Sequence, residues 1–387
     1  MKPLRPCVTA LTLTVTLALA LAAGACGGLS PGAARARQLL DRGDYAGAGA
    51  AADAELARFP REPTMWRVKI RAALGQGDAA TAVAHYESWR ALRGDDDRGA
   101  LRVMALTTLW QGLRSPSKSV RLATVQTVER LELEQLSHDV AERMTDDDDA
   151  VAAAAAVAVL TSYPQAPELV TELLSSADPV ARAIAVEGIG RKVGEHARAD
   201  LARALADSDP GVRAAAVAAF AAMADPDDTE RLSKIALGDA DGPVRADAIA
   251  ALARGDRGDL ATLAKRALGD SYLGVRLGAV PLLGDDQTTL ARIARGDDHM
   301  LALRAAVALR KHGGDPATLR AALDAALADV AWPVRASGYN QAGAILGKDG
   351  AASVANAGTA DRSLPVRLAA ARALLAAGET DAAIAAL

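Results

Sequence analysis

The sequence predicts an all-α fold, a right-handed α-solenoid of stacked helical hairpins. Of the 387 residues, 51% are hydrophobic but only 3% are aromatic. Strands favour β-branched and aromatic residues, whereas this mixture, rich in Ala and Leu, suits closely packed helices. The chain is longer than one ordinary core requires, and a similar segment returns roughly every 31 residues along it. An elongated array of helical repeats accounts for all of these observations.

Residues 1–25 are predicted to be a signal peptide. Lys2 and Arg5 form a basic head, and the uncharged apolar run Val8 to Ala23 has about the length of a signal-peptide core. The segment that ends this run, LAAGACGG, resembles bacterial lipoprotein signals, in which a small-residue box precedes a cysteine. The resemblance implies cleavage before Cys26, attachment of acyl chains such as palmitate to it, and a membrane-anchored, extracytoplasmic place in the cell envelope.

A second interpretation of this segment stays open. Ala23 stands where lipoprotein signals usually have Leu, and Ala23-Gly24-Ala25 also satisfies the rule for ordinary secretory cleavage. Cys7 would leave with the signal, so the mature protein would carry one thiol, which makes sense as a lipid attachment point. The Gly-rich residues 26–33 are predicted to be a flexible tether. Gly27 provides no acidic retention signal, which favours the outer membrane in a Gram-negative cell.

Residues 34–98 are predicted to form two helical hairpins. Three residues return after 34 positions: Gly43, Asp44 and Ala48 recur as Gly77, Asp78 and Ala82. This interval, with Trp66 near the start of the second copy, resembles the tetratricopeptide repeat. We expect Tyr86 and Trp89 to fill the groove between helices as core residues rather than to bind a ligand.

A polar break and one connecting helix follow these hairpins. The break, RGDDDR, contains Asp95 to Asp97, which we interpret as a solvated helix start. Residues 99–114 are predicted to form the connecting helix, because apolar residues such as Val103, Leu106 and Trp110 recur at helical spacing.

Residues 115–387 are predicted to form an array of about nine repeats. Each repeat opens its first helix with an apolar anchor: Val120, Val151, Ala181, Val212, Val244, Val275, Leu301, Val334 and Val366. Side chains four and eight residues after the anchor are mostly small and then larger, which places all three on one helical face. Pro281 lies inside the sixth first helix and should bend it.

An Asp five residues before the anchor and an Arg directly after it recur in most repeats. This pattern resembles the short bacterial form of the HEAT repeat, a resemblance that implies a structural ladder of these residues between repeats. The expected ladder consists of Asp207, Arg213, Asp239, Arg245, Asp270, Arg276, Asp329, Arg335, Asp361 and Arg367. We expect Asp to cap backbone N–H groups at the turn, and Arg to bind a carboxylate or carbonyl of the neighbouring repeat.

Two repeats depart from this pattern. Ala152 and Ala302 stand where Arg is expected. The seventh repeat could instead be aligned in another register, with Asp298 and Leu303-Arg304 in the Asp and Val-Arg positions.

The sequence favours neither catalysis nor a cofactor. The histidines lack the paired spacing of a zinc site, and Asp146 to Asp149 lack the spacing of a calcium loop, so we expect no metal. Gly188, Gly190 and Gly194 do not have the spacing of a nucleotide loop, and no strand precedes them. A net charge of −4 without a basic tract argues against nucleic acid. No nucleophile has a base at a suggestive spacing, so we expect no enzyme activity.

Three turns of the array differ from the others. Just before the anchors, where other repeats carry small residues, three turns carry Tyr272, Met300 and Trp332. Exposed aromatic and Met side chains are typical of interfaces, so these residues are candidates for binding a partner. Packing over the neighbouring turn is the alternative.

These features together predict a membrane-anchored scaffold or adaptor that binds a protein partner. Short bacterial HEAT-like repeats also occur in lyases and chaperones that attach bilin pigments to phycobiliproteins, so action on a tetrapyrrole-bearing partner is the alternative. The closing segment TDAAIAAL is apolar at its end, and contact with a second copy of the chain through this helix is a further expectation.

Overall fold

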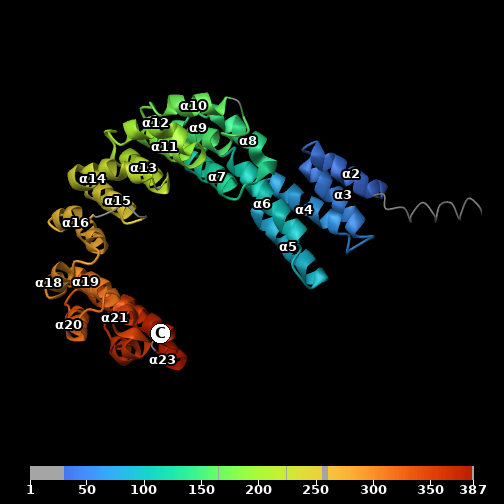
Figure 1. Cartoon of the computed structure of the whole chain (residues 1–387). Coiled ribbons are helices and arrows are strands. Elements are labelled where there is room, and N and C mark those ends of the chain that lie inside the picture. The colour runs from blue at the N-terminus through green and yellow to red at the C-terminus, as the bar shows by residue number, and fades with distance from the viewer. Residues whose placement is uncertain (1–29, 164, 224, 255–259, 386–387) are drawn as a thin grey trace, which may run out of the picture. The chain divides into compact units, whose positions relative to one another are not determined.

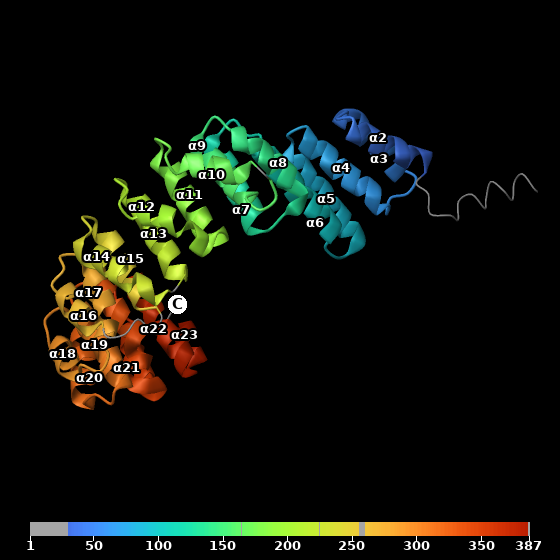
Figure 2. The ribbon, with the colours of Figure 1, turned by 45° about the horizontal axis from the view of Figure 1, so that its top comes forward.

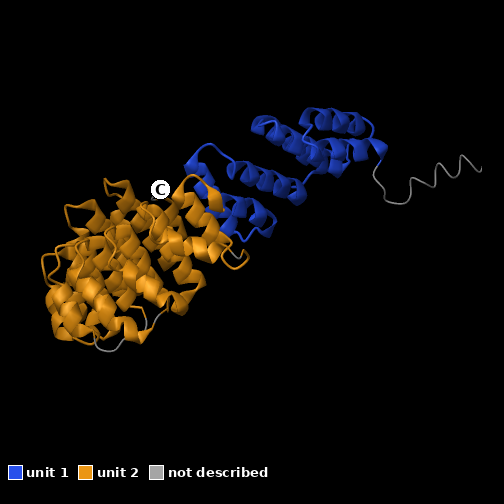
Figure 3. Ribbon diagram, turned by 90° about the horizontal axis from the view of Figure 1, so that it is seen from above, with its two compact units in different colours: residues 1–143 blue, residues 144–387 orange. Residues whose placement is uncertain are grey.

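The computed structural model describes residues 30–163, 165–223, 225–254 and 260–385. These residues form α-helices and short 3-10 helices and contain no strand (Figure 1), so the predicted all-α solenoid fold is confirmed. The chain divides into two compact units, residues 1–143 and 144–387 (Figure 3). Within the described ranges, no helix has both the length and the apolar character needed to cross a membrane.

The first unit contains helices that pack as antiparallel hairpins. Its elements are α2 (Pro31–Asp41), α3 (Tyr45–Leu56), α4 (Pro63–Gly75), α5 (Ala79–Arg93), α6 (Arg98–Gly112), α7 (Lys118–Arg130), η1 (Glu134–Leu136) and α8 (Ser137–Ala141). Helix α4 packs against α2, α3, α5 and α6 and is therefore central to this unit. The predicted connecting helix corresponds to α6. Helix α7 packs against α6, and its anchor Val120 is 45% exposed.

The first described helix begins earlier than the sequence suggested. Ser30 accepts a hydrogen bond from the N–H of Ala33 at 3.0 Å, and Pro31 occupies the first helical turn, where its missing N–H is no disadvantage. Residues 31–33, expected to be the end of the tether, are therefore helical. The predicted signal peptide and Cys26 lie outside the described residues.

The 34-residue recurrence has a backbone cause. Gly43 and Gly77 both have φ of +78°, a left-handed conformation that glycine adopts readily. The next residues, Asp44 and Asp78, are the N-caps of α3 and α5, and each accepts a backbone N–H at 2.9 Å. The recurring residues thus build the same turn twice.

The second unit is a series of hairpins joined by short turns (Figure 2). Its helices up to the proline interruption are α9 (Asp149–Ala158), α10 (Ala166–Leu173), α11 (Pro179–Lys192), α12 (Arg198–Ala204), α13 (Pro210–Met223), α14 (Thr229–Gly238), α15 (Gly242–Leu252), α16 (Ala261–Ala267) and α17 (Leu273–Ala279). Those beyond it are α18 (Gln287–Ala294), α19 (His299–Lys311), α20 (Pro316–Leu327), α21 (Trp332–Gly358), α22 (Leu364–Ala377) and α23 (Thr380–Ala385). The 3-10 segments are η2 (Glu142–Thr145), which spans the division between units, η3 (Gly194–Ala197), η4 (Pro226–Asp228) and η5 (Val280–Leu283).

The first helices of successive repeats pack directly on one another. Contacts run in series from α9 through α11, α13, α15, α17, α19 and α21 to α22. The predicted buried face is present: the anchors Val212 and Val244 are 1% exposed, and Ala216, Ala248 and Phe220 are completely buried. Burial of this face is what stabilises the stack, because a single hairpin cannot bury it alone.

One proline and one glycine interrupt helices of the second unit. Helix α17 ends at Ala279, and Pro281 lies in the 3-10 turn η5, because proline cannot donate the backbone hydrogen bond that would continue an α-helix. Helix α21 contains a break at Gly347, where φ is +78° and ψ is 178°. Each interruption separates a first helix from the segment that follows it.

Candidate functional site

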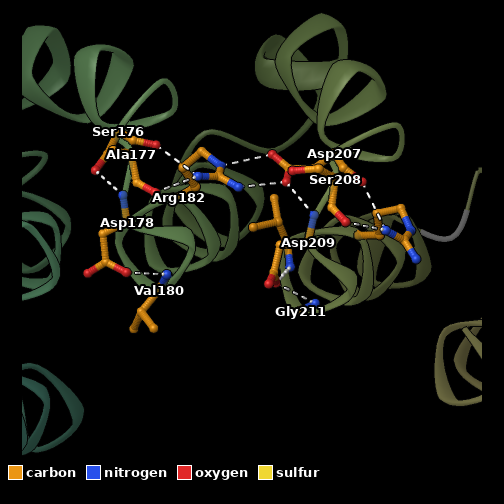
Figure 4. A network of polar contacts seen from close by, with 11 residues as sticks. Ser176, Ala177, Asp178, Val180, Arg182, Asp207, Ser208, Asp209 and Gly211 are labelled. Atoms are coloured by element: carbon orange, nitrogen blue, oxygen red, sulfur yellow. Dashed lines mark hydrogen bonds and ion pairs between the residues drawn. The ribbon is translucent and has the colours of Figure 1, made fainter.

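Arginines at the starts of first helices bind aspartates in the next turn of the second unit. Arg182 donates from Nε and Nη2 to the two carboxylate oxygens of Asp207, at 2.9 and 2.8 Å (Figure 4). Its remaining nitrogen, Nη1, donates to the carbonyl oxygen of Ser176 at 2.8 Å. One guanidinium therefore closes its own turn and holds the turn of the next repeat. Hydrogen bonds from Arg182 are the main reason why the pKa of Asp207 lies below its ordinary value.

Three further rungs repeat this bidentate geometry. They are Arg213–Asp239, Arg245–Asp270 and Arg335–Asp361, with nitrogen-to-oxygen distances between 2.7 and 3.0 Å. Asp207 and Arg213 lie six residues apart in the same copy of the motif, but they do not form an ion pair with each other. Arg213 Nη1 instead donates to the backbone carbonyl of Asp207 at 2.9 Å.

The ladder aspartate binds a backbone N–H of the turn, as expected, and a second aspartate caps the helix. Asp207 accepts the N–H of Asp209 at 2.8 Å, which shapes the turn. The residue that caps α13 is Asp209, which accepts the N–H of Gly211 at 2.8 Å. Asp178 and Asp241 cap α11 and α15 in the same way. The ladder aspartate and the cap are therefore two residues apart in this repeat, and separate carboxylates bind the preceding arginine and the helix start.

The seventh repeat changes the ladder. Gly296 occupies the ladder-aspartate position, so Arg276 reaches Asp298 through a single bond of 3.2 Å. Ala302 occupies the arginine position, and His299 Nδ1 instead lies 2.6 Å from a carboxylate oxygen of Asp329.

The seventh repeat combines features of both registers. Asp298 caps α19 by accepting the N–H of Leu301, as the cap of the first register does. Asp298 also binds Arg276, and Leu303 is 1% exposed, as the alternative register predicts, but Arg304 is exposed outside the ladder. In the last repeat, Arg367 Nη1 donates to the carbonyl of Asp361 at 2.9 Å.

Exposed apolar side chains gather at the later turns of this ladder. Trp332 is 49% exposed and Tyr272 is 42% exposed, while Met300 is partly buried. Neighbouring turn residues add to this surface: Leu273 is 36%, Val330 89% and Leu364 52% exposed. We call these six residues the turn ridge. The rungs join their turns in series, so they follow one another along one edge of the second unit.

Tyr272 also packs on the preceding turn. A Cβ added at Gly242 would lie only 2.7 Å from its ring, so the ring covers that glycine closely. The side chain of Tyr272 therefore packs on Gly242 with one part of its surface and is exposed to solvent with another. Its orientation is held by the neighbouring repeat while much of its surface remains accessible.

Three helices that begin at the turn ridge have no side-chain cap. The starts of α17, α21 and α22 have Tyr272, Ala331 and Ser363 at the cap position, and none makes a side-chain cap hydrogen bond. A missing cap costs about 1 kcal/mol of helix stability. At these three turns the chain forgoes that stabilisation and presents apolar side chains at or beside the uncapped helix start.

The residues considered in the sequence for a calcium loop or a nucleotide loop have structural roles. Asp148 caps α9 by accepting the N–H of Val151 at 3.2 Å. Gly188 lies within α11, where an added Cβ would approach Val157 to 2.3 Å, so this glycine permits close helix packing. Over the described ranges, no group of three or more His, Cys, Asp or Glu side chains could hold a metal ion. Near the C-terminus, α23 leaves Ile384 66% exposed.

Asp97 in the first unit was misinterpreted as a solvated residue. It is 2% exposed and accepts hydrogen bonds from Trp89 Nε1 at 2.7 Å, Arg67 Nη2 at 2.9 Å and the N–H of Ala100 at 3.0 Å. Trp89 is buried as expected and stacks on Trp66, with ring centroids 5.9 Å apart. Burial alone would raise the pKa of Asp97, but these hydrogen bonds lower it to about 2.

Comparison with known families agrees with this geometry. Residues 166–253 match the family model for HEAT repeats. The match extends over α10 to α15 and includes the rungs Arg182–Asp207 and Arg213–Asp239. A search of curated proteins gave no match. HEAT-like repeats are therefore present in the second unit, as their resemblance predicted.

Proposed function

We propose that this protein is a membrane-anchored, extracytoplasmic scaffold that binds a protein partner through the turn ridge and has no catalytic activity of its own. HEAT repeats suggest a protein-interaction scaffold, because stacked hairpins present extended surfaces without a catalytic centre. The observation that carries the proposal is the loss of three helix caps at turns that instead expose Tyr272, Leu273, Val330, Trp332 and Leu364.

Rigid placement supports the same proposal. The backbone beside Trp332 is fixed, since Arg335 binds the carbonyls of Asp329 and Val330 and the carboxylate of Asp361. An interface side chain held in place before binding loses less conformational entropy on association. The ladder thus acts as the support, and the turn ridge as the contact surface.

We expect Trp332→Ala combined with Tyr272→Ala to weaken partner binding about 30-fold or more, because central aromatic residues dominate interface energies. The partner would first be identified with a photo-crosslinking amino acid placed at position 332 in cells, and its affinity then measured by biolayer interferometry. Val180, 51% exposed at the corresponding turn of the third repeat, provides the control site and the control variant Val180→Ala. Equal affinity for the double variant and the wild type would contradict the proposal. Saturable binding of biliverdin by the purified protein would favour the tetrapyrrole alternative.

The membrane anchor is a separate part of the proposal and is supported by the sequence alone. We expect the mature protein to begin at Cys26 with acyl chains attached, and Cys26→Ser to move the protein from the membrane fraction to the soluble fraction. Mass spectrometry of the N-terminal peptide and cell fractionation measure these results. An unmodified Cys26 at the mature N-terminus would show plain secretion instead.

A further inference from the structure

The first unit contains a cavity of about 410 Å³ that the scaffold function does not use. It lies among the end of α2, the start of α3, the end of α4, the middle of α6 and the segment from η1 to α8. Its apolar wall consists of Leu40, Tyr45, Val103, Leu106, Trp110 and Leu136. A volume of this size is within the range of small-molecule sites, which are concave, mostly apolar and carry few polar groups.

Trp110 is exposed but fixed. Its side chain is 38% exposed, and the guanidinium of Arg114 lies 4.3 Å from the ring centroid. Arg114 is itself held by Asp139 at 2.8 Å and Glu142 at 3.1 Å. The cation–π contact and the two ion pairs therefore orient the indole without burying it.

The opposite walls are also formed in advance. The ring of Tyr45 packs closely on Gly75, where an added Cβ would lie 2.5 Å from it. Gln111 donates from Nε2 to the carbonyl of Leu74, which ties α6 to α4 beside the cavity. Walls that are already in position need little reorganisation to receive a ligand.

The charges of the cavity favour an anion. Asp139 lines it, but its carboxylate already binds Arg114. Arg71 also lines it and is exposed, and among the described residues it forms no ion pair or hydrogen bond. A guanidinium presents a planar fork that matches a carboxylate, which can accept two hydrogen bonds from it.

We propose that this cavity binds an organic acid with a compact apolar body, which packs against Trp110 and the aliphatic wall while its carboxylate binds Arg71. Arg71 is the cationic side chain in the cavity lining, which matches a ligand with one carboxylate, and the apolar wall of the cavity matches an alkyl or aryl body. The hydroxyl of Thr107, which also lines the cavity, is a further donor at the same wall. This site is independent of the turn ridge, which belongs to the second unit.

The test compares acids with their uncharged amides. Decanoate, octanoate and phenylacetate would each be titrated beside decanamide, octanamide and phenylacetamide into the whole chain carrying Cys26→Ser, so that no acyl chain is attached. Isothermal titration calorimetry and tryptophan fluorescence would measure binding. We expect at least one acid to bind saturably and about tenfold or more tightly than its amide, because a charged hydrogen bond is worth at least that factor.

Variants separate the two parts of the site. Arg71→Gln is expected to remove the preference for the acid while leaving amide binding unchanged, and Trp110→Ala to weaken acid and amide together. Arg130→Gln, an exposed arginine of α7 outside the cavity wall, is the matched control and should bind as the wild type does. Circular dichroism melting curves would show that Arg71→Gln remains folded.

Three results with the acids and the variants would overturn the proposal. They are the absence of saturable binding for every acid, an acid preference that survives Arg71→Gln, and binding that is unaffected by Trp110→Ala. Binding of a partner's acidic peptide at this site while all the free acids fail would also overturn it. None of these results depends on the turn ridge, so the failure of one proposal is distinguishable from the failure of the other.

Discussion

Asp239→Ala is expected to lower the free energy of unfolding of the second unit by about 3 kcal/mol, because it leaves a largely buried guanidinium without its anion. The side chains of Arg213 and Asp239 are only 13% and 4% exposed, and two hydrogen bonds of 2.8 Å join them across two repeats. Contacts between neighbours supply much of the stability of a repeat array, so the loss of one rung should weaken the stack at that interface.

Urea denaturation of the whole chain, followed by far-UV circular dichroism, measures this effect. Glu230→Ala is the matched control, since Glu230 pairs with Lys234 on the surface, where both side chains are more than 70% exposed. We expect the control to change stability by less than about 0.5 kcal/mol. Similar losses for Asp239→Ala and Glu230→Ala would show that the ladder does not hold the repeats together.

A double-mutant cycle with Arg213→Ala tests the pair itself. Removal of both partners leaves no uncompensated charge, so we expect the double variant to lose clearly less stability than the sum of the two single variants. Additive losses would indicate that each side chain acts through other contacts.

Acid should remove the contribution of this rung. Burial alone would raise the pKa of Asp239, but hydrogen bonds from Arg213 and from the N–H of Asp241 lower it below its ordinary 3.8. A carboxylate with a lowered pKa in the folded state stabilises the fold fully above the unfolded value, and that stabilisation is lost as the pH falls below it. The stability difference between the wild type and Asp239→Ala should therefore be constant near neutral pH and shrink below about pH 3.8.

The ladder also shows what the sequence could predict. The repeats and their buried face were predictable, because the spacing of Val212, Ala216 and Phe220 depends only on the geometry of one helix. A ladder between repeats was expected from the resemblance, but the aspartate that each arginine binds was not assigned, because Arg182 and Asp207 are 25 residues apart and meet only when repeats stack. Asp207 and Arg213 are close in sequence, but a backbone carbonyl, not a carboxylate, joins them.

The replacement of a ladder arginine by a different residue could not be predicted from the repeat pattern. His299 takes the place of an arginine from a position three residues earlier than Ala302, and the geometry of the turn makes this possible.

The exposure of Tyr272 and Trp332 agrees with their selection as candidate binding residues, while Val330 and Leu364 were missed because single apolar residues in a turn carry no signal. The cavity beside Trp110 was also missed, since its walls come from five separate segments.

Asp97→Ala is expected to destabilise the first unit by about 3 kcal/mol, although Asp95 and Asp96 beside it look identical in sequence. Asp97 is 2% exposed and joins Trp89, Arg67 and the start of α6, so its removal leaves a buried indole N–H and a guanidinium without their acceptor. Near-UV circular dichroism of the stacked pair Trp66 and Trp89 should report the loss during denaturation. Asp95→Ala is the control from the same acidic run, because Asp95 is exposed and its ion pair is with its neighbour Arg93.

The pH dependence distinguishes the charge of Asp97 from its role as a helix cap. Its pKa of about 2 lies below the ordinary 3.8, a difference equivalent to about 2 kcal/mol of stability that is present above pH 3.8 and lost as the pH falls toward 2. Asp97→Asn keeps one oxygen that can cap α6 by accepting from the N–H of Ala100, but its NH2 group cannot accept from Trp89 and it has no charge to lose. We therefore expect Asp97→Asn to be less stable than the wild type at pH 7 and to match it more closely near pH 2. A gap between them that does not narrow in acid would mean that the shape of the cap, rather than the buried charge, stabilises this unit.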